Sequence, residues 1–228
     1  MEGEDRIPTQ GKCAYCGKAS TRGGMARHLR TCAKRREAVA AAGRKPGKNR
    51  PFIHLQVRDR WSGEYWLHLE MDGSARLDEL DYYLRAIWLN CCGHLSQFYA
   101  GGMKREEIDF DERARDVFKP GVELTHIYDF GSSSYTLVKA VDAREGKATT
   151  SDPVVLMARN APPPIPCAEC GELSTQLCME CQAEYGEWTP LCDAHVQGHE
   201  HEPEDMLPPV NSPRLGVCGY DGPAEPPY

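Results

Sequence analysis

Cysteine and histidine are the side chains of this chain best suited to bind a metal, and both types are clustered along the sequence. Five cysteines and three histidines lie within 35 positions near the C-terminus, in four pairs with short spacings. A structural zinc site takes four thiolate or imidazole ligands in a tetrahedron, so eight candidate ligands suit two ions. These ligands are Cys167, Cys170, Cys178, Cys181, Cys192, His195, His199 and His201.

A second cluster lies near the N-terminus and has the spacing of a compact zinc finger. Its candidate ligands are Cys13, Cys16, His28 and Cys32. Two thiolates three positions apart suit a tight turn, while His28 and Cys32 lie one helical turn apart on one face of a helix. Met25 lies three residues before His28, where an apolar side chain would be buried. The two clusters together predict three zinc ions per chain.

The two clusters resemble known zinc modules. The N-terminal cluster is similar to the classical zinc-finger family, with cysteine in place of the last histidine. The C-terminal cluster resembles the B-box and related cross-brace fingers. That resemblance implies one site made of Cys167, Cys170, Cys192 and His195, and another made of Cys178, Cys181, His199 and His201. A sequential pairing is an alternative, and Cys218 is a candidate to replace one of the last two histidines.

Both clusters are predicted to be structural. A catalytic zinc ion keeps one position open for water, whereas closed sets rich in cysteine contribute folding energy. No catalytic residue is predicted from these clusters. Cys91 and Cys92 are adjacent, so we expect their side chains to point in different directions at a packed helix end.

The charge is unevenly distributed, although the chain as a whole has a net charge of -7. Residues 1–50 carry 13 Lys and Arg against 4 Asp and Glu, residues 51–160 carry 13 against 18, and residues 161–228 carry 1 against 12. A basic segment next to a zinc finger favours contact with nucleic-acid phosphates, here through residues 18–50. The candidate contacts are Arg22, Arg27, Arg30, Lys34, Arg35 and Arg36.

The acidic C-terminal cluster is predicted to bind a protein partner through residues 167–202. The chain as a whole is therefore predicted to be a non-catalytic binding or adaptor protein. An alternative is an adaptor that binds only proteins, in which the basic segment docks on the acidic end of the same chain. The acidic, polar start of the chain and the absence of a long apolar run predict a cytoplasmic protein without a membrane contact.

The residues between the clusters predict an α+β domain with a mostly antiparallel sheet. Apolar residues alternate along 52–57 and 65–71 and along 122–130 and 135–141, which indicates two β-hairpins, and residues 154–158 suit a further strand. If the first hairpin is symmetrical about Trp61, His54 pairs with His68. Residues 77–88 change to the three- and four-residue spacing of one main amphipathic helix.

Two strings in this domain resemble the plasmid pRiA Orf-three-like family. They are residues 74–98, with Leu77-Asp-Glu-Leu80 and His94-Leu-Ser-Gln-Phe98, and residues 119–131, which end in Tyr128-Asp-Phe-Gly131. The resemblance covers residues 50–160 and implies an α+β fold linked to plasmid or mobile-element biology, with no established activity. A further alternative is an enzyme acting on nucleic acid, with a site around His54, His68 and Asp129.

The sequence thus divides into six segments. They are a zinc finger (1–36), a basic linker (37–50), the α+β domain (51–160), a proline-rich spacer (161–166), a double-zinc module (167–202) and a proline-rich tail (203–228).

Overall fold

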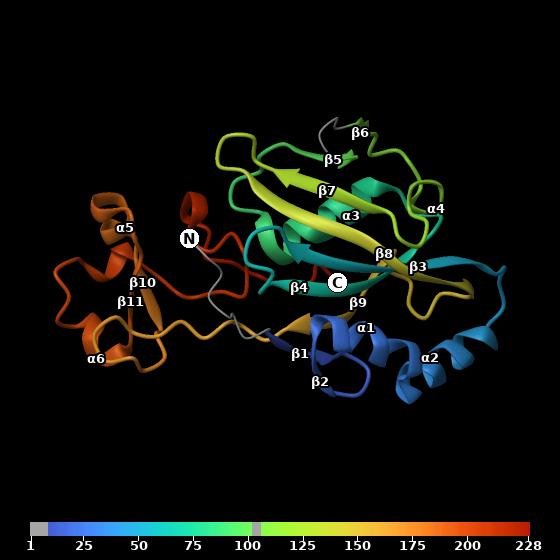
Figure 1. Ribbon diagram of the computed structural model, residues 1–228, viewed down its shortest axis with the longest axis horizontal. Helices are drawn as coiled ribbons and strands as arrows, with labels where there is room; N and C mark the ends of the chain where they lie inside the picture. The colour runs from blue at the N-terminus through green and yellow to red at the C-terminus, as the bar shows by residue number, and fades with distance from the viewer. Residues whose placement is uncertain (1–8, 102–105) are drawn as a thin grey trace.

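A computed structural model describes residues 9–101 and 106–228 and confirms a mostly antiparallel α+β fold (Figure 1). Nine strands form one sheet in the order β2-β1-β9-β4-β3-β8-β7-β5-β6, and every pairing in it is antiparallel. The strands are β1 (Gln10–Cys13), β2 (Ala19–Thr21), β3 (Arg50–Asp59), β4 (Trp66–Asp72), β5 (Ser96–Ala100), β6 (Glu106–Ile108), β7 (Glu123–Tyr128), β8 (Ser134–Gly146) and β9 (Val154–Asn160). The start of the chain, on which the cytoplasmic prediction rests, lies outside the described residues.

The first predicted hairpin forms between β3 and β4, but its predicted register is wrong by two residues. His68 pairs with Gln56, and His54 pairs with Glu70. The reason lies in the turn, where the Asp59 carboxylate accepts hydrogen bonds from the backbone N–H groups of Ser62 and Tyr65. These bonds stabilise a turn that is centred on Ser62 rather than on Trp61.

One face of the sheet is apolar and is covered by helix α3 (Leu77–Leu84) and the π-helical turn Arg85–Leu89 that continues it. The alternating residues of the hairpin, among them Leu55 and Leu69, are fully buried against this helix. Trp88 fills the same core. A short helix, α4 (Ala114–Val117), lies at the edge of this layer. The prediction that one face of this hairpin is apolar and buried is therefore confirmed.

The opposite face of β4 carries polar residues and is covered by the N-terminal finger. Helices α1 (Arg22–Thr31) and α2 (Ala33–Gly43) lie on this side, so the first residues of the expected linker are helical. Met25 and Leu29 of α1 pack with Trp66 of the sheet. Strand β1 pairs with β9, and a Cβ atom at Gly11 would lie 2.2 Å from the Arg159 carbonyl oxygen. The finger is therefore an integral part of the sheet, and glycine is required where the two meet.

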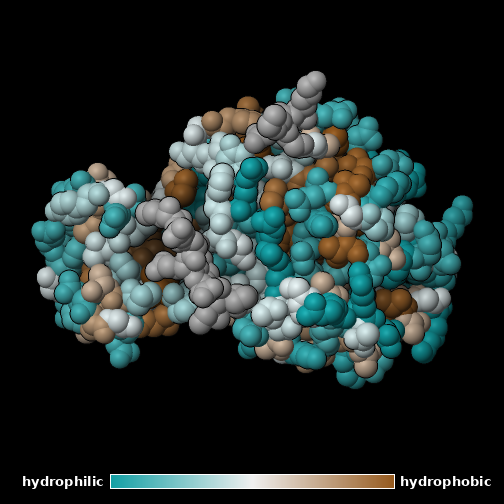
Figure 2. All heavy atoms as spheres, viewed as in Figure 1, coloured by the Kyte–Doolittle hydropathy of each residue, from teal (hydrophilic) through white to brown (hydrophobic). Residues whose placement is uncertain are grey.

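The C-terminal cysteines lie in a small module with its own three-stranded sheet, in the order β11-β10-β12 (Figure 1). Its elements are β10 (Gln176–Cys178), α5 (Met179–Tyr185), β11 (Thr189–Leu191), α6 (Asp193–Val196), a 3-10 turn (Pro203–Asp205) and β12 (Met206–Leu207). The module stands beside the large sheet as a separate lobe (Figure 1, Figure 2), and the chain then returns to the α+β domain along a tail that includes a second 3-10 turn, Val217–Gly219.

The tail after the module is packed against the α+β domain. Ser212 and Arg214 are fully buried, and the Ser212 hydroxyl donates to the Trp88 carbonyl oxygen at 2.6 Å. Asn160, at the end of β9, and Asn211, at the start of the tail, are joined by two side-chain hydrogen bonds. Within the described ranges, no helix is long and apolar enough to cross a membrane.

Candidate metal centres

The first candidate centre of the C-terminal module brings together Cys167, Cys170, Cys192 and His195. The Sγ atoms of Cys170 and Cys192 lie 3.7 Å apart, and His195 Nδ1 lies 3.6 Å from Cys167 Sγ. Two thiolates bound to a tetrahedral zinc ion lie about 3.8 Å apart, and a thiolate and an imidazole nitrogen about 3.6 Å apart. The spacing of the side chains therefore suits such an ion.

The second centre of the module brings together Cys178, Cys181, His199 and His201. His199 presents Nε2 to Cys181 Sγ at 3.3 Å, whereas His201 presents Nδ1 to Cys178 Sγ at 3.2 Å. Use of different ring nitrogens lets two histidines separated by one residue converge on one point. His201 Nε2 lies 3.4 Å from a carboxylate oxygen of Glu184, a contact of the kind that orients a metal-binding ring.

The N-terminal finger brings together Cys13, Cys16, His28 and Cys32. Cys16 Sγ lies 3.2 Å from His28 Nε2, while Cys13 and Cys32 are buried. The Thr21 hydroxyl caps α1 by accepting from the Gly24 N–H group. Met25 is fully buried, as the spacing predicts.

These three groups can hold metal ions, and each offers four protein ligands. The grouping in the module is the one that the B-box resemblance implies, and the sets of a sequential pairing are not brought together. Because four protein ligands complete a tetrahedron, such a centre has no open position for water or substrate. The arrangement is chemically suited to stabilising a fold.

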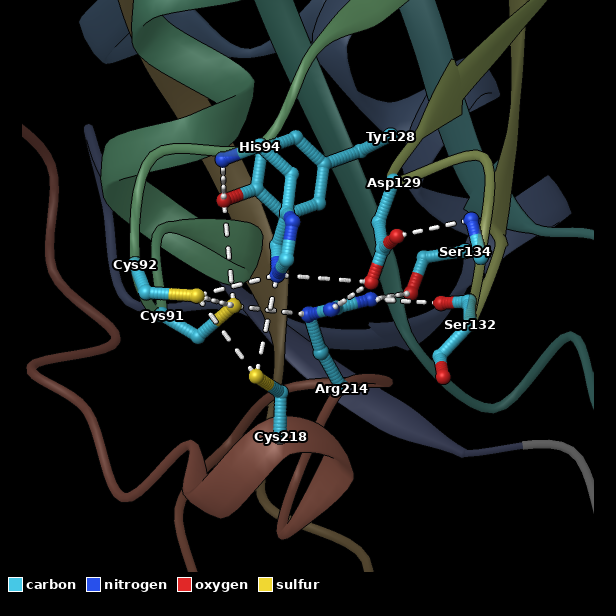
Figure 3. Close-up of polar contacts among 10 residues, drawn as sticks. Cys91, Cys92, His94, Tyr128, Asp129, Ser132, Ser134, Arg214 and Cys218 are labelled. Carbon is cyan, nitrogen blue, oxygen red and sulfur yellow. Dashed lines mark hydrogen bonds and ion pairs between the residues drawn. The ribbon is translucent and has the colours of Figure 1, made fainter.

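Two predictions about the remaining cysteines are wrong. Cys91 and Cys92 do not point apart, because their Sγ atoms lie 3.8 Å from each other (Figure 3). Cys218 does not approach His199 or His201; its Sγ lies 3.5 Å from that of Cys92. Sequence reasoning missed this group because Cys218 lies 126 positions after Cys92. The glycine-rich string Gly216–Gly222 around Cys218 was the available signal.

The side chains of the six predicted nucleic-acid contacts differ in whether they already interact with other residues of the chain. Arg35 forms a buried ion pair with Glu70, and Arg30 forms an exposed one with Asp142. Arg22 is partly buried, and Lys34 pairs with Glu37 on its own helix. Arg36 is exposed and donates to the Arg30 carbonyl oxygen, and Arg27 is exposed. Much of the basic charge of the finger therefore neutralises acidic residues of the same chain.

The side chains of the enzyme alternative do not form one site. His54 and His68 are buried beneath the finger, where His54 Nε2 lies 2.8 Å from His68 Nδ1. His68 Nε2 lies 3.0 Å from the Arg22 carbonyl oxygen. Asp129 instead pairs with Arg214 just after the end of β7, and it caps the following turn by accepting a hydrogen bond from the Gly131 N–H group.

Burial gives this histidine pair a defined effect on stability. Desolvation lowers the pKa of His54 from 6.5 to about 2, helped by the charge of His68, and lowers that of His68 to about 4. The unfolded chain therefore binds more protons below pH 6.5, so stability is fully present above that pH and is lost as the pH falls. We expect the free energy of unfolding to fall by up to about 1.4 kcal/mol per pH unit for each histidine.

Urea unfolding at pH 7.5, 6.5 and 5.5 measures this effect. The variant His54→Gln removes one proton site and leaves every candidate metal ligand in place, so its pH dependence is expected to be shallower than that of the wild type. Equal slopes in the two proteins would contradict a neutral, buried His54.

No family model matches this sequence, and no curated protein matches it. Among solved structures, the protein of unknown function MM3350 from Methanosarcina mazei Go1 is similar over part of the fold. That alignment has a TM-score of 0.40 and 13% identity, and it covers 49% of this chain and 68% of the other.

Proposed function

We propose that this chain is a non-catalytic zinc protein whose three predicted zinc ions stabilise two binding surfaces. The observation that carries the proposal is the convergence of all twelve predicted ligands into three closed sets of four. Closed sets supply folding energy and leave no coordination position for a reaction. The surfaces around the metal centres therefore provide the function, through binding.

The C-terminal module is the proposed surface for a protein partner. Leu173 and Tyr185 are 64% and 65% exposed and provide apolar surface on the module. A hollow of about 300 Å³ between its two metal centres is bordered by Glu169 and Glu200. The Tyr185 hydroxyl lies 3.5 Å from a carboxylate oxygen of Glu200, and a surface that combines exposed apolar side chains with carboxylates suits a partner that presents lysine or arginine together with apolar residues.

The finger and α2 form the proposed surface for nucleic acid. Arg30 and Arg35 form ion pairs within the chain. We therefore assign the contact with nucleic-acid phosphates to exposed lysines and arginines of the finger and the residues that follow it. These are Lys12, Lys18, Arg27, Arg36, Arg44, Lys45 and Lys48. Such residues bind phosphates without reading sequence. Support for a link to plasmid or mobile-element biology comes from the family resemblance of residues 50–160.

Binding of the full chain to random DNA and RNA duplexes at several salt concentrations tests this proposal. We expect binding that weakens as salt rises, and the double variant Lys18→Glu/Arg27→Glu should weaken it further and reduce the salt dependence by about two released counterions. The matched control Arg115→Glu/Lys119→Glu makes the same charge change at exposed positions on α4 and just after it, and should bind like the wild type.

Two results would contradict the nucleic-acid surface. One is the absence of binding to either polymer at low salt, which would leave the adaptor that binds only proteins. The other is an equal loss of affinity in both double variants, because a general charge effect would then explain the binding.

A further inference from the structure

A fourth group of metal-binding side chains lies between the α+β domain and the tail. It consists of Cys91, Cys92 and His94, which follow the helix of the apolar core, and of Cys218 in the tail (Figure 3). Their ligand atoms all lie within 4.8 Å of one another. Cys92 and Cys218 are exposed at the surface, so an ion could reach the group from solvent.

We propose that these four side chains bind a fourth zinc ion, which fastens the tail to the α+β domain. The Sγ atom of Cys92 lies 3.8 Å from that of Cys91 and 3.5 Å from that of Cys218. Cys218 Sγ lies 3.6 Å from His94 Nε2. Apart from the shorter distance of 2.9 Å between Cys92 Sγ and His94 Nε2, these separations are close to the values of about 3.8 and 3.6 Å expected around tetrahedral zinc. Three thiolates and one imidazole are a common ligand set for a structural zinc ion.

The surroundings of the group are suited to its charge. A zinc ion with three thiolates and one neutral imidazole carries a net charge of -1, which requires compensation in a partly buried place. Arg214 is fully buried, and its Nε donates a hydrogen bond to Cys91 Sγ at 3.4 Å. Its Nη2 forms an ion pair with Asp129 at 2.6 Å. Asp129 shares the positive charge of Arg214 and also lies 3.5 Å from His94 Nε2, so the contribution of Arg214 to the site is an N–H donor to one ligand sulfur.

The backbone around Cys218 is held in a conformation that costs energy. Cys218 has a φ of 57°, a left-handed backbone conformation that residues other than glycine seldom adopt. Gly216 and Gly219 flank it, both with positive φ. A Cβ atom at Gly216 would lie 2.1 Å from the Trp188 ring of the module. Such a strained turn is expected where bonds to an ion outweigh its cost.

The fourth ion would fix the second end of the module. The chain leaves the α+β domain after β9 and returns through the tail, so an ion bound by both Cys92 and Cys218 closes a loop across 126 positions. This role does not depend on what the finger or the module binds. Zinc at the fourth group would also account for the three cysteines outside the predicted sites.

Zinc analysis of the full chain tests the site directly. We expect the double variant Cys92→Ser/Cys218→Ser to contain one zinc ion fewer than the wild type, whatever the occupancy of the other three groups. Both side chains are exposed, so serine does not disturb the core. The control Ser132→Ala should keep the wild-type count, because only the backbone carbonyl oxygen of Ser132 contacts Arg214. With cobalt in place of zinc, the double variant should lose a matching part of the thiolate-to-cobalt absorption.

Trypsin tests the fastening role, because Arg214 provides the only cleavage position beyond Arg159. Release of residues 215–228 is expected to be at least tenfold faster in the double variant than in the wild type and in Ser132→Ala. Equal zinc counts, or a Cys92–Cys218 disulfide detected by mass spectrometry in the purified wild type, would overturn the zinc site. Loss of one zinc ion without faster cleavage would overturn the fastening role. Failure of the chain to bind nucleic acid would overturn neither.

Discussion

The variant Cys178→Ser is expected to unfold the C-terminal module while the nine-stranded sheet stays folded. Cys178 is fully buried at the start of α5, and its Sγ belongs to the second centre of the module. Few apolar side chains of the module are buried, chiefly Leu177 and Leu191. A core of this size does not fold alone, whereas a structural zinc ion contributes on the order of 10 kcal/mol.

Zinc analysis and amide hydrogen exchange check this expectation. The variant should lose at least one zinc ion, and exchange should become fast in residues 167–207 but remain slow in β3 and β4. The control Ala183→Ser changes an exposed residue of the same helix and should match the wild type. Unchanged exchange in the module of the Cys178 variant would show that the ion does not hold it together.

The second large effect is expected at the interface between the finger and the sheet. Glu70 is almost fully buried and accepts hydrogen bonds from Arg35 of the finger at 2.7 Å and from Arg144 of β8 at 3.0 Å. Burial by itself would raise the pKa of Glu70, but the hydrogen bonds and charges of Arg144 and Arg35 outweigh it and keep that pKa below its ordinary value. The carboxylate is therefore ionised at neutral pH.

The variant Glu70→Ala would leave two largely buried guanidinium groups without their partner. Breaking a buried pair in this way costs about 3–5 kcal/mol, which we expect as the loss in the free energy of unfolding measured with urea. The control Glu37→Ala removes a carboxylate from an exposed pair with Lys34 and should cost less than about 1 kcal/mol. Similar losses in the two variants would contradict the buried network.

Features set by local sequence could be predicted. The alternation of Leu67, Leu69 and Met71 identified the face of β4 that belongs to the main apolar core, because successive side chains of a strand point to opposite faces. The four short Cys/His spacings marked the module ligands in the same way, since ligands on one turn or one helix must be close in sequence.

Features set by distant parts of the chain could not be predicted. The register of the first hairpin depends on hydrogen bonds to the Asp59 side chain, which hydrophobic alternation does not reveal. The burial of His54 and His68 depends on the finger docking over them, and hydrophobic alternation does not identify which segment covers a polar face. Cys218 reaches Cys92 only because the tail folds back, and nothing in the spacing of either string measures that return.

The hydrogen bonds between Asn160 and Asn211 show how the module is joined to the α+β domain. They bring the two ends of the module side by side, so the module is an inserted domain rather than a C-terminal appendage. The last residues of the chain then belong to the domain that precedes the insertion. A fragment that stops within the spacer 161–166 would lack Ser212 and Arg214, two buried parts of the α+β domain, so fragment boundaries should be chosen with the tail included.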